Sequence, residues 1–559
     1  MSSNIFSILN TAKLGLLTQQ LAIEVTGNNI ANVQTEGYSR QVVNLESNTP
    51  RAISQGQLGT GVRVSGIERV HDQFLFLQIL AEGAATGDFN VQKDVFQQLE
   101  ILFNENQGRS LNNEFSEFFA GLQDLSTNPS GLPERANLLT QGQTLTEVFN
   151  NLGDQLFQIQ RDIDAIVADE VTEINTLTGE IAKLNQAIFA NEPGKSTAND
   201  LRDQRDRLVK QLSEKIDIQL VNESDGQVSL TLGNGTALVL RDKTFELSTG
   251  LNGNNSSFLD LFVSNGAGGT TNVTTAIQGG GLKGYLDMRD TEIAAIKHKL
   301  NLLAAGFVKE FNRVHQQGFG LDGGTGANFF TPLEPTVTVN TNNTGTAQVA
   351  MTNASPATAS VDRYEMVFTG AGAFTLNNLT TGFASGAFTF TPGSAFNLAG
   401  GLAVTITGSA AAGDRFKFSV SDNAASVMKV SSEVLANSQK IAAGNTTNGD
   451  GGNALDLADL QSGQTFNSVT LQSGSGAFTF DEFFNAIVSS IGIQSASVQA
   501  GVRQQEGVLL QLNNRRESIS GVSIDEELIN MIKFQQAFNA AARLINVVDE
   551  LFDTLINRI

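Results

Sequence analysis

The chain has 559 residues and carries 35 basic and 57 acidic side chains, for a net charge of -22. Its length excludes a single hydrophobic core, so we expect several domains. The acidic excess argues against nucleic acid and anionic membranes as partners, and the absence of cysteine excludes disulfides and thiolate metal sites.

The first predicted element is a helix within residues 1–37. Leu9, Leu16, Ile23 and Ile30 recur every seven residues, which is typical of a coiled-coil seam. The segment lacks the charged start, apolar stretch and small-residue cleavage site of a secretory signal, so we expect no cleaved signal peptide. The chain contains no run of 18 or more apolar residues, so the sequence predicts no membrane-spanning helix.

Beyond the first helix the pattern changes to alternating polar and apolar residues, which predicts a two-stranded ribbon near residues 38–68. Helical periodicity then returns, and Pro133 suits the first turn of a very long helix of roughly 85 Å. Its apolar seam includes Ile163 and Ile166, after which a four-residue insertion predicts local unwinding of a coiled coil. A shorter helix ending near Ile216 should run back beside it.

The central part of the chain alternates between strand and helix patterns. Residues 217–282 read as a small β subdomain and residues 325–423 as an inserted β domain of low charge. Residues 38–216, 283–324 and 424–522 carry helical patterns, and we expect them to form one rod domain.

The last predicted helix lies within residues 523–559. Ser523 and Glu526 have the spacing of a capping box, and two apolar stripes then repeat every seven residues. Two stripes on one helix require more than one partner helix. The residues expected at subunit interfaces are Leu9, Leu16, Ile23, Ile30, Phe534, Phe538, Leu544, Ile545, Val548, Leu551, Phe552 and Leu555.

These patterns predict an α+β multidomain protein. Both halves of the chain should contribute to a discontinuous, long α-helical or coiled-coil rod, with mostly antiparallel β domains inserted into it. Residues 1–37 and 523–559 should form a terminal coiled-coil region for assembly. The alternative is that both terminal helices belong to the core of an ordinary globular protein, but terminal segments normally fray unless they dock.

No constellation of catalytic, cofactor-binding or metal-ligating residues stands out. His71, His298 and His315 lie far apart in the sequence and have no carboxylates at metal-ligand spacing. The glycine-rich segment 323–326 lacks the lysine and the strand-loop-helix setting of a phosphate loop. We therefore predict no enzyme activity and no cofactor.

Residues at both ends of the chain resemble the flagellar axial-protein family of rod, hook and hook-associated proteins. Residues 28–37 are similar to its rod and hook signature, and 61–64 with Ile67, Arg69 and Asp72 to a companion motif. Residues 37–41 and 520–528 are similar to the versions found in hook-associated members. The signature residues are Asn28, Asn29, Ala31, Asn32, Thr35, Gly37, Tyr38, Ser39 and Arg40.

The resemblance implies a structural protein of the bacterial flagellum that links the hook to the filament. It implies terminal helices paired in an inner tube, and a ring of copies that contacts hook protein and a second hook-associated junction protein. It also implies an extracellular location, type III export without a cleaved signal, and an export chaperone that covers the C-terminal helix.

Two other functions stay open at this point. Hook or rod protein shares the Asn28-Asn29 motif, although the long helical region 134–216 argues against it. A secreted glycan-binding adhesin would need exposed aromatic platforms, and the chain has no tryptophan and only three tyrosines.

Overall fold

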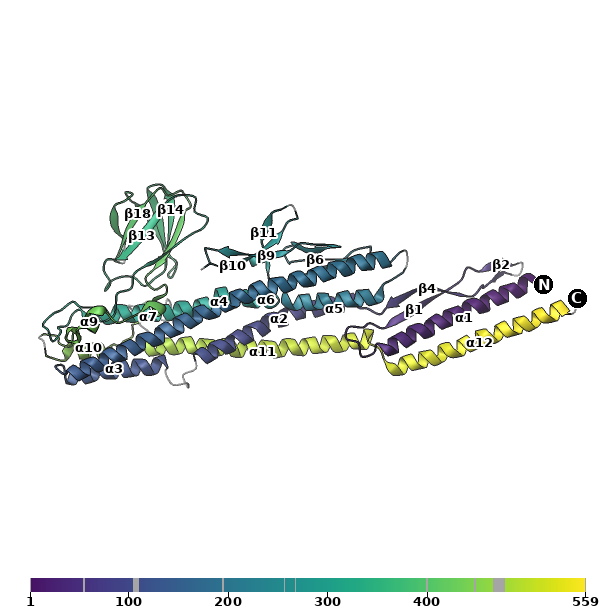
Figure 1. The fold of residues 1–559 in the computed structure, drawn as a ribbon, viewed down its shortest axis with the longest axis horizontal. Helices are drawn as coiled ribbons and strands as arrows, with labels where there is room; N and C mark the ends of the chain where they lie inside the picture. Colours follow the sequence, from purple (N-terminus) through teal and green to yellow (C-terminus); the bar gives the residue numbers. More distant parts are fainter. Residues whose placement is uncertain are drawn as a thin grey trace.

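The computed structural model describes residues 2–53, 56–103, 110–193, 196–255, 257–266, 268–398, 401–446, 449–465 and 478–557. It is elongated, with long helices lying along one axis and a group of strands projecting from its side (Figure 1). Helices and antiparallel sheets occupy separate stretches of the chain, so the predicted α+β class is confirmed.

The first and last helices form a pair at one end of the molecule (Figure 1). They run antiparallel, because the first ends where the last begins. A β ribbon lies along the first helix, where a Cβ atom on Gly61 would be 3.4 Å from the Cα atom of Thr11. The elements are α1 (Ser2–Ala31), α12 (Ile524–Asn557), β1 (Gln41–Ser47), β2 (Arg51–Ile53), β3 (Gly56–Leu58) and β4 (Val62–Arg69), with β1 paired to β4 and β2 to β3.

Next to this pair, the body of the molecule packs α2 against α11, and α4 against both α3 and α5. These helices are α2 (Gln73–Leu102), α3 (Leu111–Thr127), α4 (Leu132–Asn191), α5 (Asn199–Lys215) and α11 (Phe480–Ser520). Helix α4 has 60 residues, about 90 Å at 1.5 Å per residue, and begins with Pro133 in its first turn.

The inserted four residues in the seam of α4 change which side chains are buried. Ile163 is buried as predicted, but the prediction for Ile166 is wrong, since that side chain is 37% exposed. Val167 and Val171 take its place, because two consecutive steps of four residues keep the apolar side of the helix facing the core.

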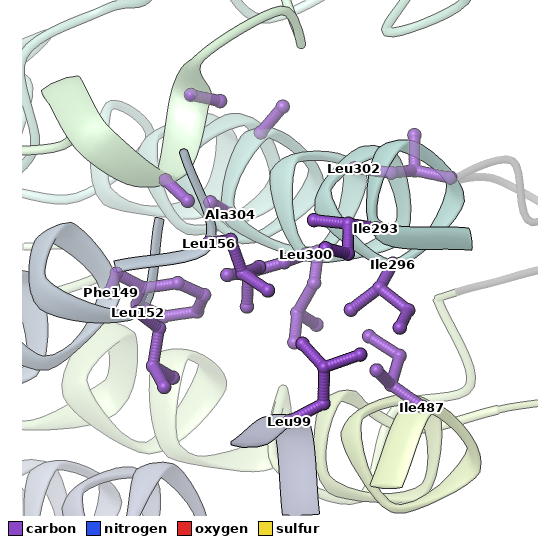
Figure 2. Packing of buried hydrophobic residues seen from close by; sticks show 14 of the residues in the cluster. Leu99, Phe149, Leu152, Leu156, Ile293, Ile296, Leu300, Leu302, Ala304 and Ile487 are labelled. Carbon is purple, nitrogen blue, oxygen red and sulfur yellow. The ribbon is translucent and has the colours of Figure 1, made fainter. Parts of the chain in front are cut away.

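The core of the body brings together segments that are far apart in the sequence. Figure 2 shows Leu99 of α2, Leu156 of α4 and Ile487 of α11 converging on Leu300. Leu300 belongs to the buried helix α7, which follows a short helix and a π-helical turn. These elements are α6 (Gly281–Asp287), the turn Met288–Glu292 and α7 (Ile293–His315).

Phenylalanine dominates the part of the core farthest from the terminal pair. The ring of Phe307 lies 5.1 Å from that of Phe480 and 5.2 Å from that of Phe115, both edge to face. Phe329 and Phe330, which follow α7, extend the cluster. Short elements cover it: α8 (Ala424–Val427), α9 (Ser432–Ala436), the 3-10 turn Ser438–Lys440 and α10 (Gly452–Asp459).

Two small antiparallel sheets lie on α4, within the predicted β subdomain. The Asn185 amide of α4 donates to the carbonyls of Val228 (2.8 Å) and Arg241 (2.6 Å), and the Asn175 amide to that of Leu247 (2.8 Å). The strands are β5 (Gln219–Asn222), β6 (Val228–Thr231), β7 (Ala237–Leu240), β8 (Lys243–Thr244), β9 (Leu247–Asn252), β10 (Phe258–Ser264) and β11 (Thr270–Asn272), followed by the 3-10 turn Thr274–Ala276.

The strands that project from the body form two antiparallel sheets, called the β sandwich below (Figure 1). One sheet has the order β12-β19-β14-β15-β16 and the other β13-β18-β17. The strands are β12 (Thr336–Val339), β13 (Gln348–Asn353), β14 (Tyr364–Gly370), β15 (Ala373–Asn378), β16 (Ala384–Thr389), β17 (Ala395–Leu398), β18 (Leu402–Thr407) and β19 (Arg415–Ser419). Within the described residues, no helix is both long and apolar enough to cross a membrane.

Candidate assembly site

Helix α12 turns one stripe of side chains toward α1. A Cβ atom on Gly15 of α1 would lie 3.8 Å from the Cβ atom of Ala541, and the rings of Phe6 and Phe552 are 5.3 Å apart. The stripe repeats at alternating steps of four and three residues, and Val548 in it is only 1% exposed. Its members, the inner stripe, are Glu527, Met531, Phe534, Phe538, Ala541, Ile545, Val548 and Phe552.

A second set of apolar side chains on α12 faces solvent. Leu544, Val547 and Leu551, called the outer group below, are 40%, 50% and 47% exposed. Leu528 and Ile532 are exposed near the start of the same helix, and Leu17 is 51% exposed on α1. Water-exposed leucine, isoleucine and valine in such numbers on a paired helix are typical of an interaction surface.

The residues predicted at subunit interfaces therefore differ in exposure in the structure. Leu544 and Leu551 are exposed, whereas Val548 is buried within the chain. Leu9, Leu16, Ile23 and Ile30 are half-buried on α1, as are Phe534, Phe538, Ile545 and Phe552 on α12. The side chain of Leu555 lies outside the described residues. Whether these residues touch other copies stays a prediction.

The side chain of Asn29 joins the terminal pair to the ribbon. It is 1% exposed, and its nitrogen donates to the Gln41 carbonyl (2.9 Å) and to the Glu527 carboxylate (3.0 Å). Its oxygen accepts from the Gln41 backbone N–H (3.0 Å) and the Tyr38 hydroxyl (2.9 Å). All the hydrogen-bonding capacity of this amide is used, and it connects α1, β1 and the first turn of α12.

The following signature residues attach the same junction to the body. Ser39 donates from its backbone N–H (2.8 Å) and its hydroxyl (2.9 Å) to the Asp203 carboxylate on α5. The backbone N–H of Arg40 donates to the last carbonyl of α11, at Ser520 (2.8 Å), and its guanidinium pairs with Glu526 (3.2 Å). These contacts fix where the terminal pair leaves the body.

Gly37 makes the turn that precedes this junction. Its φ angle of +79° is one that residues with a side chain rarely adopt. A Cβ atom here would also approach the Arg207 side chain to 2.6 Å. Both observations explain why glycine occupies this position.

The remaining signature residues lie on the solvent side of the helix end. The Asn32 amide donates to the Asn28 carbonyl (3.0 Å) and side-chain oxygen (2.9 Å), and Thr35 donates to Asn32 (3.2 Å). Ala31, the last residue of α1, is exposed. These residues close the helix locally, whereas Asn29 and residues 37–41 make the long-range contacts.

Charged groups near the junction are paired. Arg69 of β4 binds Asp203 (2.6 Å) and Asp206 (2.7 Å), and all three side chains are largely buried. Burial raises the pKa of Asp203, against the opposing effect of Arg69. Burial raises the pKa of Tyr38 as well, and the neighbouring carboxylates of Asp200, Asp203 and Glu527 raise it further. The Tyr38 hydroxyl therefore stays protonated as a donor to Asn29.

Comparison with known proteins extends over the whole chain. A family model described as the flagellar hook-associated protein FlgK helical domain matches residues 96–330, and two basal body rod protein models match residues 9–38 and 516–558. Flagellar hook-associated protein 1 of Escherichia coli is 28% identical over 561 residues, covering 99% of both chains. The chain belongs to the flagellar hook-associated protein 1 family.

Other relatives agree with this family. Hook-associated protein 1 of Bacillus subtilis is 28% identical over 585 residues, covering 99% of this chain and 98% of the relative. The flagellar hook junction protein FlgK from Burkholderia pseudomallei has a similar fold, with a TM-score of 0.67 and 22% identity over 79% of this chain and all of that chain. The resemblance stated from the terminal motifs is thus confirmed.

Two residues that bond the junction were not predicted from the sequence. Asp203 is one acidic residue in a highly charged helix, and no pattern distinguishes it from its neighbours. Glu527 was interpreted only as an acidic residue in the first turn of a helix. Its position four residues before Met531 and seven before Phe534 is the signal that places it in the inner stripe.

The three histidines occupy unrelated places in the fold. His315 is fully buried, with Nδ1 2.9 Å from the Ala327 carbonyl and Nε2 accepting from the Ala442 backbone N–H (2.9 Å). His298 lies on α7, and His71 lies near Asp206 (3.9 Å). Among the residues described here, no three histidine, aspartate or glutamate side chains are grouped to hold a metal ion.

Proposed function

We propose that the protein is the structural junction between the hook and the filament of a bacterial flagellum. The observation that carries this function is the end-to-end similarity to hook-associated protein 1 of other bacteria. This similarity favours the junction over hook or rod protein and over a glycan-binding adhesin, because it includes the central helical domain as well as the termini. We propose a structural role without catalysis.

We propose further that the terminal pair builds the inner tube of the junction. Each copy has its own α1 packed on α12, and the outer group is left in water. Full burial of a leucine or valine contributes about 1.5–3 kcal/mol. The three side chains are already about half covered, so burying the rest of each against helices of neighbouring copies would stabilise a ring of subunits by roughly half of that amount. This supports Leu544 and Leu551 among the predicted interface residues.

The domain division follows from the same proposal. Residues 1–37 and 523–559 would be the assembly region, and 38–216, 283–324 and 424–522 a discontinuous helical rod. Residues 217–282 and 325–423 would be β domains inserted into it. The long helices that pack in the body and the sheets at its side support this division.

The partners are proposals of the same kind. Hook protein would contact one side of the ring and the second hook-associated junction protein the other. An export chaperone would cover α12 before assembly, since its apolar side chains are exposed whenever α1 and other copies are absent. The protein would act outside the cell, after type III export without a cleaved signal.

Loss of the gene tests the function most directly. Cells without it should assemble a hook that carries no filament and should shed flagellin into the medium. Loss of the hook itself would indicate a hook or rod protein, and normal filaments would contradict a junction role. Deletion of residues 523–559 tests the assembly region, because the body should stay folded while incorporation into the flagellum is abolished.

A further inference from the structure

The β sandwich differs in charge from the rest of this acidic chain. Residues 335–421 contain three acidic and three basic residues, so they are neutral, whereas the whole chain carries -22. Residues 366–413 contain no charged residue at all. Three of the six charges have a partner close by: Arg415 pairs with Glu365 (2.9 Å), and Arg363 pairs with Asp422 (3.2 Å), which follows directly after this range.

One edge of the sandwich is formed by β16, the outermost strand of the five-stranded sheet. Its residues are mostly exposed, and Phe383 just before it is 69% exposed. Soluble proteins usually protect such an edge with lysine, an inward-pointing charge, a proline or a β-bulge. The six residues of β16 include no charge and no proline. Its pairing with β15 has a register shift between Thr375 and Asn377, and beyond it residues 387–389 of β16 pair regularly.

We infer that β16 is a docking edge for a second copy of this chain, which adds a strand of its own β sandwich to the sheet. This inference rests on the proposed function, because a ring of subunits holds copies side by side. Backbone hydrogen bonds along the added strand would supply the attraction, as in other cases of strand addition.

Charge favours a second copy as the occupant. Two molecules with a net charge of -22 repel each other. At physiological ionic strength, salt screens this repulsion only at separations beyond about 8 Å. Copies can therefore approach closely with least repulsion where their surfaces are neutral. The β sandwich supplies such a surface to both partners.

The geometry indicates which edges meet. Copies in a ring are related by rotation, so one side of each copy meets the opposite side of the next. On the side opposite β16, β12 lies beside β13, the outermost strand of the other sheet. Residues 335–361, which include both strands, are also uncharged. We therefore expect β16 of one copy to pair with the β12–β13 side of its neighbour.

The absence of natural cysteine allows a direct test. Ala387 on β16 and Ala350 on β13 are both exposed, and each would be changed to cysteine, alone and together. Isolated flagella carrying each variant would be treated with a short bis-maleimide and analysed by gel and mass spectrometry. The inference predicts a ladder of multimers of this chain for the double variant A350C/A387C and none for either single variant.

Other results would overturn the inference. Dimers from A387C alone would mean that β16 meets β16 and would overturn its pairing with the β12–β13 side. Cross-links to another flagellar protein would mean a different occupant. Intact filaments with the protein incorporated but no cross-link would disprove strand addition and leave the junction function standing. Absence of the protein from the flagellum would instead contradict the proposed function.

A charge placed on the edge gives a second measurement. Added to A350C/A387C flagella, the substitution Thr389→Lys introduces a lysine at an exposed position of β16 and should reduce the multimer ladder at least several-fold. Thr407→Lys is the matched control, because Thr407 is exposed on the central strand β18 and lies on no edge. Equal ladders for both lysine variants would contradict docking at β16.

Discussion

The Asn29 amide nitrogen donates to the Glu527 carboxylate across 3.0 Å, although the two residues are 498 positions apart in the chain. Both side chains are buried, at 1% and 4% exposure, between helices that are otherwise held by apolar contacts. A buried polar pair in a helical interface fixes the register of the two helices, because any other alignment removes the Asn29 donor from the buried Glu527 carboxylate. We interpret this pair as the contact that sets the register between α1 and α12.

Asn29→Ala should loosen the terminal pair. The substitution removes the partner of a buried carboxylate and of both backbone groups of Gln41, which should cost on the order of 3 kcal/mol. Hydrogen exchange of residues 2–31 should become faster while exchange in the body stays unchanged. Asn28→Ala is the matched control, because Asn28 is exposed and its side-chain oxygen accepts a local bond from Asn32. Equal exchange rates in the two variants would refute the role of Asn29.

Asn29→Asp should make the terminal pair sensitive to pH. The introduced carboxyl would face that of Glu527, and the repulsion raises the pKa of the introduced group above its unfolded value. Such a group is tolerated while it is protonated, so stability is lost as the pH rises through its folded pKa. Protease resistance of α1 should therefore be higher at pH 4 than at pH 8 when compared with the native chain at each pH. A difference that does not depend on pH would contradict this.

The double variant L544D/L551D should separate folding from assembly. Both side chains are exposed, so we expect the melting temperature of the purified protein to stay nearly unchanged. Charges in the outer group should block its burial against neighbouring copies and abolish incorporation into flagella. Q536D/N546D adds the same two charges at exposed polar positions of α12 and should assemble normally. Normal motility of L544D/L551D cells would rule out the outer group as an interface.

Acid should destabilise the body through His315. Burial lowers the pKa of His315 from 6.5 to about 4. The unfolded chain then takes up a proton below pH 6.5 that the folded chain does not take up until about pH 4. The stability that the neutral ring contributes is present above pH 6.5 and lost as the pH falls toward 4, by up to about 3 kcal/mol.

Denaturant unfolding at pH 7 and pH 5 measures this effect. Burial lowers the pKa of His298 to about 4 as well, so it adds to the same slope. His315→Gln should be less stable at pH 7 but should lose less stability between the two pH values than the native chain. An identical loss in both would show that His315 does not contribute.

Phe307→Ala should be strongly destabilising. Phe307 is fully buried in the phenylalanine cluster, and removal of such a ring costs about 3–5 kcal/mol. Denaturant unfolding of the body should report this loss. Phe383→Ala removes the same atoms from a ring that is 69% exposed and should change stability little. Comparable losses would mean that the cluster is not the main core of the body.

Sequence periodicity was sufficient to predict most of the helices. The seven-residue repeats gave α1 and α12, and the alternation near residues 38–68 gave the β1–β4 ribbon, because each pattern depends on which side of one element is buried. The terminal motifs were sufficient for the family. Each of these patterns lies within one short segment of the chain, so it predicts the structure of that segment without knowledge of its distant contacts.

Other features depend on contacts between distant segments. Phe534 and Val548 belong to one seven-residue repeat of α12, and Phe538 and Ile545 to the other. The sequence does not say which repeat faces α1, and in the structure the inner stripe combines residues of both. Ile166 and Val167 are equally apolar, so only the packing of α4 decides which is buried. Asp203 could not be predicted, because its partners Ser39 and Arg69 come from other elements.

The antiparallel pairing of α1 with α12 has a consequence for the order of events in folding. If one end of the chain is free to fold before the other, its terminal helix has no partner until almost five hundred further residues are free to fold as well. The body can complete its core before that moment, since its helices lie between the two. The part of the molecule that we expect to bind other copies is thus the last to close, which delays self-association until each subunit is otherwise finished.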